Sequence, residues 1–124
     1  VLDQTRDQVF SQIAEKGLEG SQASIFTALL RLRQICCHPK LTGADISQGI
    51  TESGKFEALQ DLVEEIIAEG GRILLFSQFV EMLKLIRPWL EKKGIRYEYL
   101  TGETKASDRQ TSVERFNRDR TIPV

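Results

Sequence analysis

The chain has 124 residues, of which 40% are hydrophobic, and a formal net charge of −1. This length suits one domain or part of one, and the apolar content is too high for a disordered chain. The balanced charge argues against a protein that coats nucleic acid with its whole surface, while leaving room for a local basic surface, and no apolar run reaches the roughly 20 residues of a membrane span.

Two helices are predicted before residue 38. The first carries the apolar residues Leu2, Val9, Phe10 and Ile13, and the stretch EKGLEGS breaks it. The second carries one apolar stripe, made by Ile25, Leu29, Leu32 and Cys36. Cys36 is therefore expected to pack as a small hydrophobe, and Ser21 or Ser24 is expected to cap the second helix.

Cys36, Cys37 and His38 are consecutive, and the chain has no other cysteine or histidine. A structural zinc site needs four ligands with wider spacing, so no metal site is expected here. Adjacent cysteines also make a strained disulfide. Two free thiols without a signal peptide indicate a cytoplasmic location. Pro39 disfavours helical geometry at the preceding residue, so the second helix is expected to end near His38.

From residue 54 onward, helical and extended patterns alternate. The stretch FVEMLKLIRPWLEKKG is predicted to form a helix whose inward face carries Phe79, Met82, Leu83, Ile86, Trp89 and Leu90. Ser53 is a plausible N-cap for the first of these helices, Gly70 and Gly71 end it, and Gly94 ends the next. Ser107 and Gln110 form a capping-box pattern that opens the last helix. The expected strands are RILLF at 72–76, IRYEYL at 95–100 and the start of a third at TIPV, residues 121–124.

This alternation predicts an α/β fold: an incomplete parallel sheet flanked by helices and preceded by an N-terminal helical segment. Residues 1–50 are assigned to that helical segment and its loop, and residues 51–124 to the sheet-bearing part. Two full strands and a third onset make a small sheet for a parallel architecture, which usually has several strands covered on both faces. The pattern is therefore expected to be truncated within a larger domain.

Four segments together resemble the Swi/Snf-type helicase-like ATPases of superfamily two. They are ALLRLRQICCHPKL, SGKFEALQDLVEEI, RILLFSQFVEMLKLI and YEYLTGETKASDRQTSVERFN, in this order along residues 24–124. RILLFSQF resembles the family's motif IV, and LTGETKASDRQ its motif IVa. The chain departs from the family at Thr101, where the family usually has Asp before Gly102, so no role is carried over to the loop's own acid, Glu103.

The resemblance implies a RecA-like second motor lobe, with residues 51–124 as its N-terminal part. It implies a complete parent protein that hydrolyses ATP with magnesium, translocates along double-stranded DNA and pairs this lobe with a first RecA-like lobe. The chain itself has no phosphate-binding G-x-x-x-x-G-K-[ST] loop and no Asp-Glu pair for magnesium. We therefore expect it to contain no catalytic, cofactor or metal residue and to be inactive alone.

Seven residues are predicted to contact DNA, because loops after parallel strands meet at the ligand-binding edge of a sheet, where amides, hydroxyls and cations suit phosphates. They are Ser77, Gln78, Gly102, Thr104, Lys105, Arg109 and, more weakly, Lys55 at the start of its helix. Structural alternatives stay open: Ser77 as a helix cap, Thr101–Asp108 as a solvated loop, and Arg109 in an internal salt bridge.

Two other functions compete with the motor. One is a non-catalytic α/β binding or regulatory module whose N-terminal helices dock a partner. The other is the second lobe of an RNA helicase, which shares the later segments and lacks the LRQICCHP signature of residues 32–39.

Overall fold

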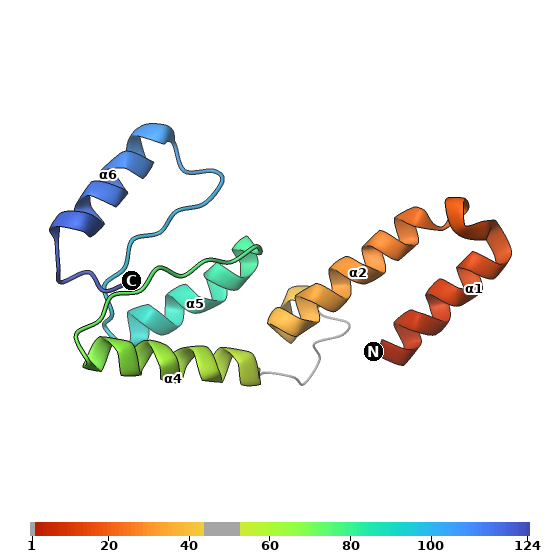
Figure 1. Ribbon diagram of the computed structural model, residues 1–124, viewed down its shortest axis with the longest axis horizontal. Helices are drawn as coiled ribbons and strands as arrows, with labels where there is room; N and C mark the ends of the chain where they lie inside the picture. The colour runs from red at the N-terminus through yellow and green to blue at the C-terminus, as the bar shows by residue number, and fades with distance from the viewer. Residues whose placement is uncertain (1, 44–52) are drawn as a thin grey trace. The chain divides into compact units, whose positions relative to one another are not determined.

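The computed structural model describes residues 2–43 and 53–124, which form two compact units (Figure 1). The N-terminal unit is Val1–Glu57 and the C-terminal unit is Ala58–Val124. The N-terminal unit contains α1 (Leu2–Gly20), α2 (Gln22–Cys37) and the short 3₁₀ helix η1 (Pro39–Thr42), and α4 (Gly54–Ala68) begins in it. The C-terminal unit contains the rest of α4, α5 (Val80–Lys92) and α6 (Ala106–Arg118).

The N-terminal unit is built around the α1–α2 hairpin (Figure 1). The expected break in EKGLEGS is confirmed, because Gly17 has φ 74° within α1 and a turn separates the helices at Ser21. Ser21 occupies the expected N-cap position of α2, but its side chain makes no capping hydrogen bond. Its buried hydroxyl donates to the carbonyl of Gln12 at 3.0 Å and so ties the turn back to α1.

Each of the two helices α4 and α5 ends in a Schellman motif, as the glycines predicted. At the end of α4, the N–H of Gly71 donates to the carbonyl of Ile66 at 2.8 Å, and Gly70 takes φ 77°. At the end of α5, Ile95 donates to the carbonyl of Leu90 at 2.9 Å, and Gly94 takes φ 68°. These endings reverse the chain sharply and start the extended segments that follow.

The small core of the C-terminal unit comes from α4, α5 and the last residues of the chain. α5 contributes the buried stripe predicted from its spacing, and Pro88 lies within the same helix. The buried apolar residues are Val63, Met82, Ile86, Leu90 and Ile122.

The predicted parallel sheet is wrong for the described residues, which are helical or irregular and contain no strand. The three segments expected to be strands are not helical: 72–76, 95–100 and 121–124. A single backbone hydrogen bond joins the last segment to each of the other two. The Ile73 N–H donates to the Pro123 carbonyl at 2.7 Å, and the Glu98 N–H donates to the Val124 carbonyl at 3.0 Å. A ladder needs such bonds to repeat. Pro123 has no N–H to donate, and Leu74 and Phe76 are 69% and 87% exposed.

Candidate nucleic-acid interface

Ser77 and Gln78 form the turn between the segment 72–76 and α5. The Ser77 hydroxyl accepts from the N–H of Phe79 at 3.1 Å and donates to the carbonyl of the same residue at 3.0 Å. The N-cap of α5 is Phe79, so the Ser77 side chain closes the turn before the helix and does not cap it. Gln78 is exposed at the tip of this turn.

A second turn, Thr101–Thr104, follows the segment 95–100 and is closed by its own polar groups. The Thr104 N–H donates to the Thr101 carbonyl at 3.2 Å, and the Thr101 N–H donates to the Thr104 hydroxyl at 3.0 Å. The Glu103 N–H donates to the Thr101 hydroxyl at 3.3 Å. Gly102 is exposed in this turn, and a Cβ at its position would meet no atom within 4 Å. The two threonines therefore give the turn a defined shape.

Lys105 is the exposed N-cap of α6, and no side chain caps the helix. The expected capping box is wrong, because α6 begins at Ala106 and the Ser107 hydroxyl donates to the Asp108 carboxylate at 3.1 Å. The N–H groups of the first helical turn have no partner within a helix. The Lys105 side chain makes no hydrogen bond or ion pair with any residue that the structure describes. This end of α6 thus combines a free cation with backbone donors.

Arg109 lies in the first turn of α6, and its guanidinium reaches back over the Thr101–Thr104 turn. Nε donates to the Thr104 carbonyl at 2.8 Å, and Nη2 donates to the carbonyls of Thr101 at 2.8 Å and Gly102 at 3.2 Å. The internal alternative foreseen for this residue was a salt bridge. The contacts are instead to neutral carbonyl oxygens.

The two turns lie toward the same end of α5 in the C-terminal unit (Figure 1). Lys84, in the second turn of α5, donates to Glu81 at 2.6 Å, and this bond raises the pKa of the Lys84 ammonium, with a smaller contribution from Glu103 in the loop. Six of the seven predicted residues therefore lie in these two turns or at the start of α6. Lys55, exposed at the second position of α4, belongs to the N-terminal unit.

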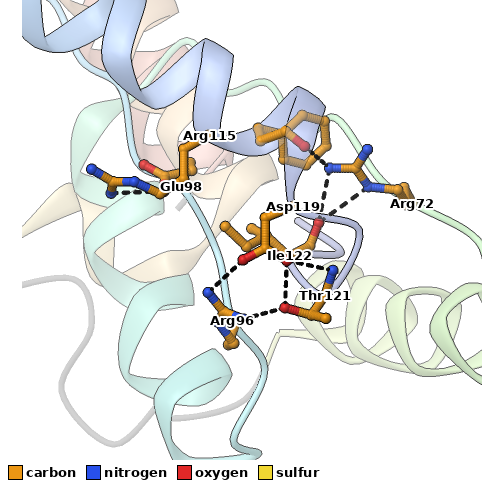
Figure 2. Close-up of polar contacts among 8 residues, drawn as sticks. Arg72, Arg96, Glu98, Arg115, Asp119, Thr121 and Ile122 are labelled. Atoms are coloured by element: carbon orange, nitrogen blue, oxygen red, sulfur yellow. Dashed lines mark hydrogen bonds and ion pairs between the residues drawn. The ribbon is translucent and has the colours of Figure 1, made fainter.

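Sequence reasoning missed Arg72, which joins three parts of the C-terminal unit (Figure 2). Its guanidinium lies 3.8 Å from the centre of the Phe116 ring and donates to the carbonyls of Phe116 and Ile122, the latter at 3.1 and 3.2 Å. Beside it, Arg96 bonds Asp119 at 2.9 Å, and Arg96 and Asp119 both bond Thr121 (Figure 2). No local pattern in the sequence identifies these partners, because they lie 23 to 50 residues along the chain from the arginine that binds them.

Arg87 organises the segment that leads into the second turn. Its guanidinium lies 4.7 Å from the Tyr99 ring centre and donates to the Tyr97 hydroxyl at 3.0 Å, and that hydroxyl donates to Glu91 at 2.6 Å. Arg87 is exposed on α5, and local spacing in the sequence does not identify its partners. These contacts hold residues 97–99 against α5.

The consecutive Cys36, Cys37 and His38 have different surroundings. Cys36 is exposed, so its predicted packing is wrong, and Cys37 is half-buried. His38 is only 3% exposed, and its Nδ1 accepts from the Lys40 N–H at 3.2 Å, which caps η1. Its ring meets Phe56 edge to face, with centroids 5.8 Å apart. Burial lowers the pKa of this imidazole, and the nearby Lys40 charge lowers it further.

Comparison with known proteins adds the family context. The family model described as the helicase conserved C-terminal domain matches residues 54–124. Protein CHROMATIN REMODELING 5 of Arabidopsis thaliana is 33% identical over 115 residues, covering 82% of this chain and 7% of that protein. Helicase SWR1 of Candida albicans is 41% identical over 73 residues, covering 59% of this chain and 4% of that protein.

A solved structure, the C-terminal part of the Fun30 ATPase domain, is similar in fold. It has a TM-score of 0.55 and 22% sequence identity, and the match covers 99% of this chain and 43% of that one. The chain therefore spans less than half of this structure and 4–8% of the length of the first curated relatives it matches.

The expected cytoplasmic location is overturned by these relatives, several of which are named for chromatin remodelling, and chromatin is nuclear. The error has a chemical reason. Free cysteines indicate a reducing compartment, and the nucleus keeps thiols reduced as the cytosol does. Among the helices that the structure describes, none has the length and apolar character to cross a bilayer.

Proposed function

Residues 54–124 belong to the helicase conserved C-terminal domain family, as the resemblance to Swi/Snf-type ATPases implied, and from this premise we propose that the chain is part of an ATP-driven motor that moves along double-stranded DNA. In this proposal the complete protein hydrolyses ATP with magnesium between two lobes. The chain supplies part of the second lobe, which grips the DNA backbone. The relatives named as chromatin-remodelling factors favour duplex DNA over RNA as the track.

The observation that carries the proposal is the exposed Lys105 at the uncapped start of α6. The Thr101–Thr104 turn leads directly into the uncapped start of α6, where Lys105 is exposed and without a partner among the described side chains. Backbone N–H groups at a helix start and an unpaired ammonium are suited to phosphate, and they carry no base-specific information. We therefore expect sequence-independent DNA contacts that weaken as salt rises.

Lys105→Ala in the full-length protein tests this proposal. DNA-stimulated ATPase should fall several-fold while DNA-free ATPase stays near wild type, because the lost contact is made only with DNA bound. The slope of log affinity against log salt should shrink by about 0.9, the value for one phosphate contact.

Lys92→Ala is the matched control, since Lys92 is also an exposed lysine but lies in the last turn of α5, at the other end of that helix from the two turns. Lys92→Ala should leave both the DNA-stimulated ATPase and the salt slope of DNA binding unchanged. A Lys105→Ala protein with wild-type DNA stimulation and an unchanged salt slope would remove this surface from the DNA track.

A further inference from the structure

Arg109 differs from Lys105 because its guanidinium is already engaged in hydrogen bonds within the loop. Three hydrogen bonds of 2.8, 2.8 and 3.2 Å run from its Nε and Nη2 to the carbonyl oxygens of Thr104, Thr101 and Gly102. A guanidinium presents its donors in a rigid planar fork, so it can hold several acceptors in fixed relative positions. A lysine ammonium is a compact point charge on a flexible stem and cannot reproduce that fork.

The carbonyl oxygens that Arg109 binds would otherwise oppose an approaching phosphate. Three oxygen atoms with partial negative charge lie in the same turn that offers Gly102 and leads to Lys105. The guanidinium offsets their charge and binds both ends of the turn, at Thr101 and at Thr104. The turn's own hydrogen bonds between these two threonines, at 3.0 and 3.2 Å, then fix the backbone between them.

This arrangement also explains a cation at a position that helix electrostatics disfavours. A positive side chain in the first turn of a helix opposes the helix dipole, and Arg109 occupies the fourth residue of α6. Its partners are loop carbonyls outside the helix, which compensate for the unfavourable position. The same contacts leave only Nη1 without a hydrogen bond to any described residue. Direct phosphate binding through Nη1 is therefore the alternative that an experiment must separate.

We infer that Arg109 is a positioning residue, which holds the Thr101–Thr104 turn in the shape that presents Lys105 and the start of α6 to a phosphate, and that Arg109 itself does not bind the phosphate. This inference rests on the proposed function of the same surface. It assigns the charge contact to Lys105 and the geometry of the loop to Arg109.

The test compares Arg109→Lys with Arg109→Gln in the full-length protein, using a duplex oligonucleotide as the probe. A positioning role predicts that both variants lose DNA affinity by a similar factor, roughly three- to tenfold, and that both keep the wild-type salt slope. Arg109→Lys keeps the positive charge but lacks the planar guanidinium, so it does not restore the lost contacts. Direct phosphate binding predicts the opposite pattern, in which Arg109→Lys stays near wild type and Arg109→Gln loses about 0.9 of slope.

A second measurement does not depend on DNA. Amide hydrogen exchange at Thr101 and Thr104 reports the two hydrogen bonds that these N–H groups donate within the turn, to the Thr104 hydroxyl and to the Thr101 carbonyl. Both Arg109 variants should raise that exchange by roughly fivefold to tenfold relative to wild type, the scale of one lost hydrogen bond. Lys105→Gln, which removes charge without removing a turn contact, should leave it unchanged. Unchanged exchange in both Arg109 variants would overturn the positioning role.

The controls distinguish the two proposals. If Lys105→Gln lowers the salt slope and Arg109→Lys keeps full affinity, the DNA-binding surface stands and the positioning role fails. If Lys105→Gln leaves the DNA affinity and its salt slope unchanged, this surface is not the DNA track. The role of Arg109 in positioning the turn for DNA binding then fails as well.

Discussion

His38 shows how a buried residue can resemble a metal ligand in the sequence and have a structural role in the fold. Its neighbours Cys36 and Cys37 are oriented into different surroundings, one exposed and one half-buried. His38 is buried, accepts a backbone hydrogen bond through Nδ1 and packs against the Phe56 ring. These contacts connect the end of α2 and η1 to the first turn of α4. They suit a neutral imidazole whose proton is on Nε2.

The His38 imidazole should titrate below its ordinary pKa of 6.5, because burial and Lys40 both disfavour its charged form. A histidine with a lowered pKa in the folded state binds fewer protons there than in the unfolded chain. Folding stability is therefore lost as pH falls through about 6.5 toward the folded-state pKa, and it is regained above 6.5. His38 is the only histidine, so its Hε1 signal in proton NMR gives the folded pKa directly.

His38→Asn provides the control for this pH dependence. Asn offers an acceptor oxygen at the cap and does not titrate. The free energy of unfolding, measured with urea at pH 7.5 and 5.5, should fall more for wild type than for the variant. A measured His38 pKa of 6.5 or higher would contradict the account.

At the scale of elements, the ends of α4 and α5 decide where the extended segments start. Both helices end in a Schellman motif with a glycine at positive φ. At α4 the following residue, Gly71, is constrained for a different reason. A Cβ there would lie 2.6 Å from Ile66 Cγ2 and 2.8 Å from the Ile66 carbonyl oxygen. The backbone of the turn thus passes too close to α4 for any side chain.

Gly71→Ala should destabilise the C-terminal unit by about 1–3 kcal/mol, the usual range for overpacking. The mechanism is displacement of the Gly71 N–H from the Ile66 carbonyl, which it bonds at 2.8 Å. Urea unfolding followed by fluorescence of Trp89, the only tryptophan, measures the change. Gly54→Ala is the matched control, because a Cβ there meets no atom within 4 Å in the first turn of α4. It should be neutral or stabilising by up to about 1 kcal/mol, and equal effects of the two changes would refute the close-contact argument.

At the scale of the whole molecule, Arg72 connects segments that are far apart in the sequence. It begins the segment after α4 and binds carbonyls at the end of α6 and near the end of the described chain (Figure 2). Ile122, one of these partners, is also a buried core residue. Only one backbone hydrogen bond joins the last extended segment to each of the other two among the described residues, so the Arg72 side chain is a main connection between the first and last segments.

Arg72→Ala should lower the free energy of unfolding of the C-terminal unit by about 2–3 kcal/mol. It removes charge-assisted hydrogen bonds to two carbonyls and a cation–π contact with Phe116. Arg96→Ala is the comparison, since the Arg96 side chain is 56% exposed, and exposed ion pairs contribute up to about 1 kcal/mol. Trp89 fluorescence in urea measures both variants. An Arg72→Ala effect no larger than that of Arg96→Ala would show that the Arg72 contacts do not hold the segments.

The sequence by itself determined the helices, where several of them end, and the family. Apolar spacing predicted the buried stripe of α5, and Gly70, Gly71 and Gly94 predicted the two helix ends, because these signals act between residues within one or two turns of each other. The ordered segments from ALLRLRQICCHPKL to YEYLTGETKASDRQTSVERFN indicated the family that the comparison confirmed.

The tertiary structure decided which polar groups pair and what the extended segments form. Ser21 bonds Gln12 instead of capping α2, Arg109 bonds loop carbonyls, and Cys36 is exposed. The expected sheet is absent from the described residues, because strand pairing requires repeated bonds between segments far apart in the chain, and local apolar runs cannot specify those bonds. The same physical reason applies to Arg72, whose partners lie 44 and 50 residues away. Local sequence patterns determine local structure, whereas contacts between side chains so far apart in the sequence form only when the chain has folded.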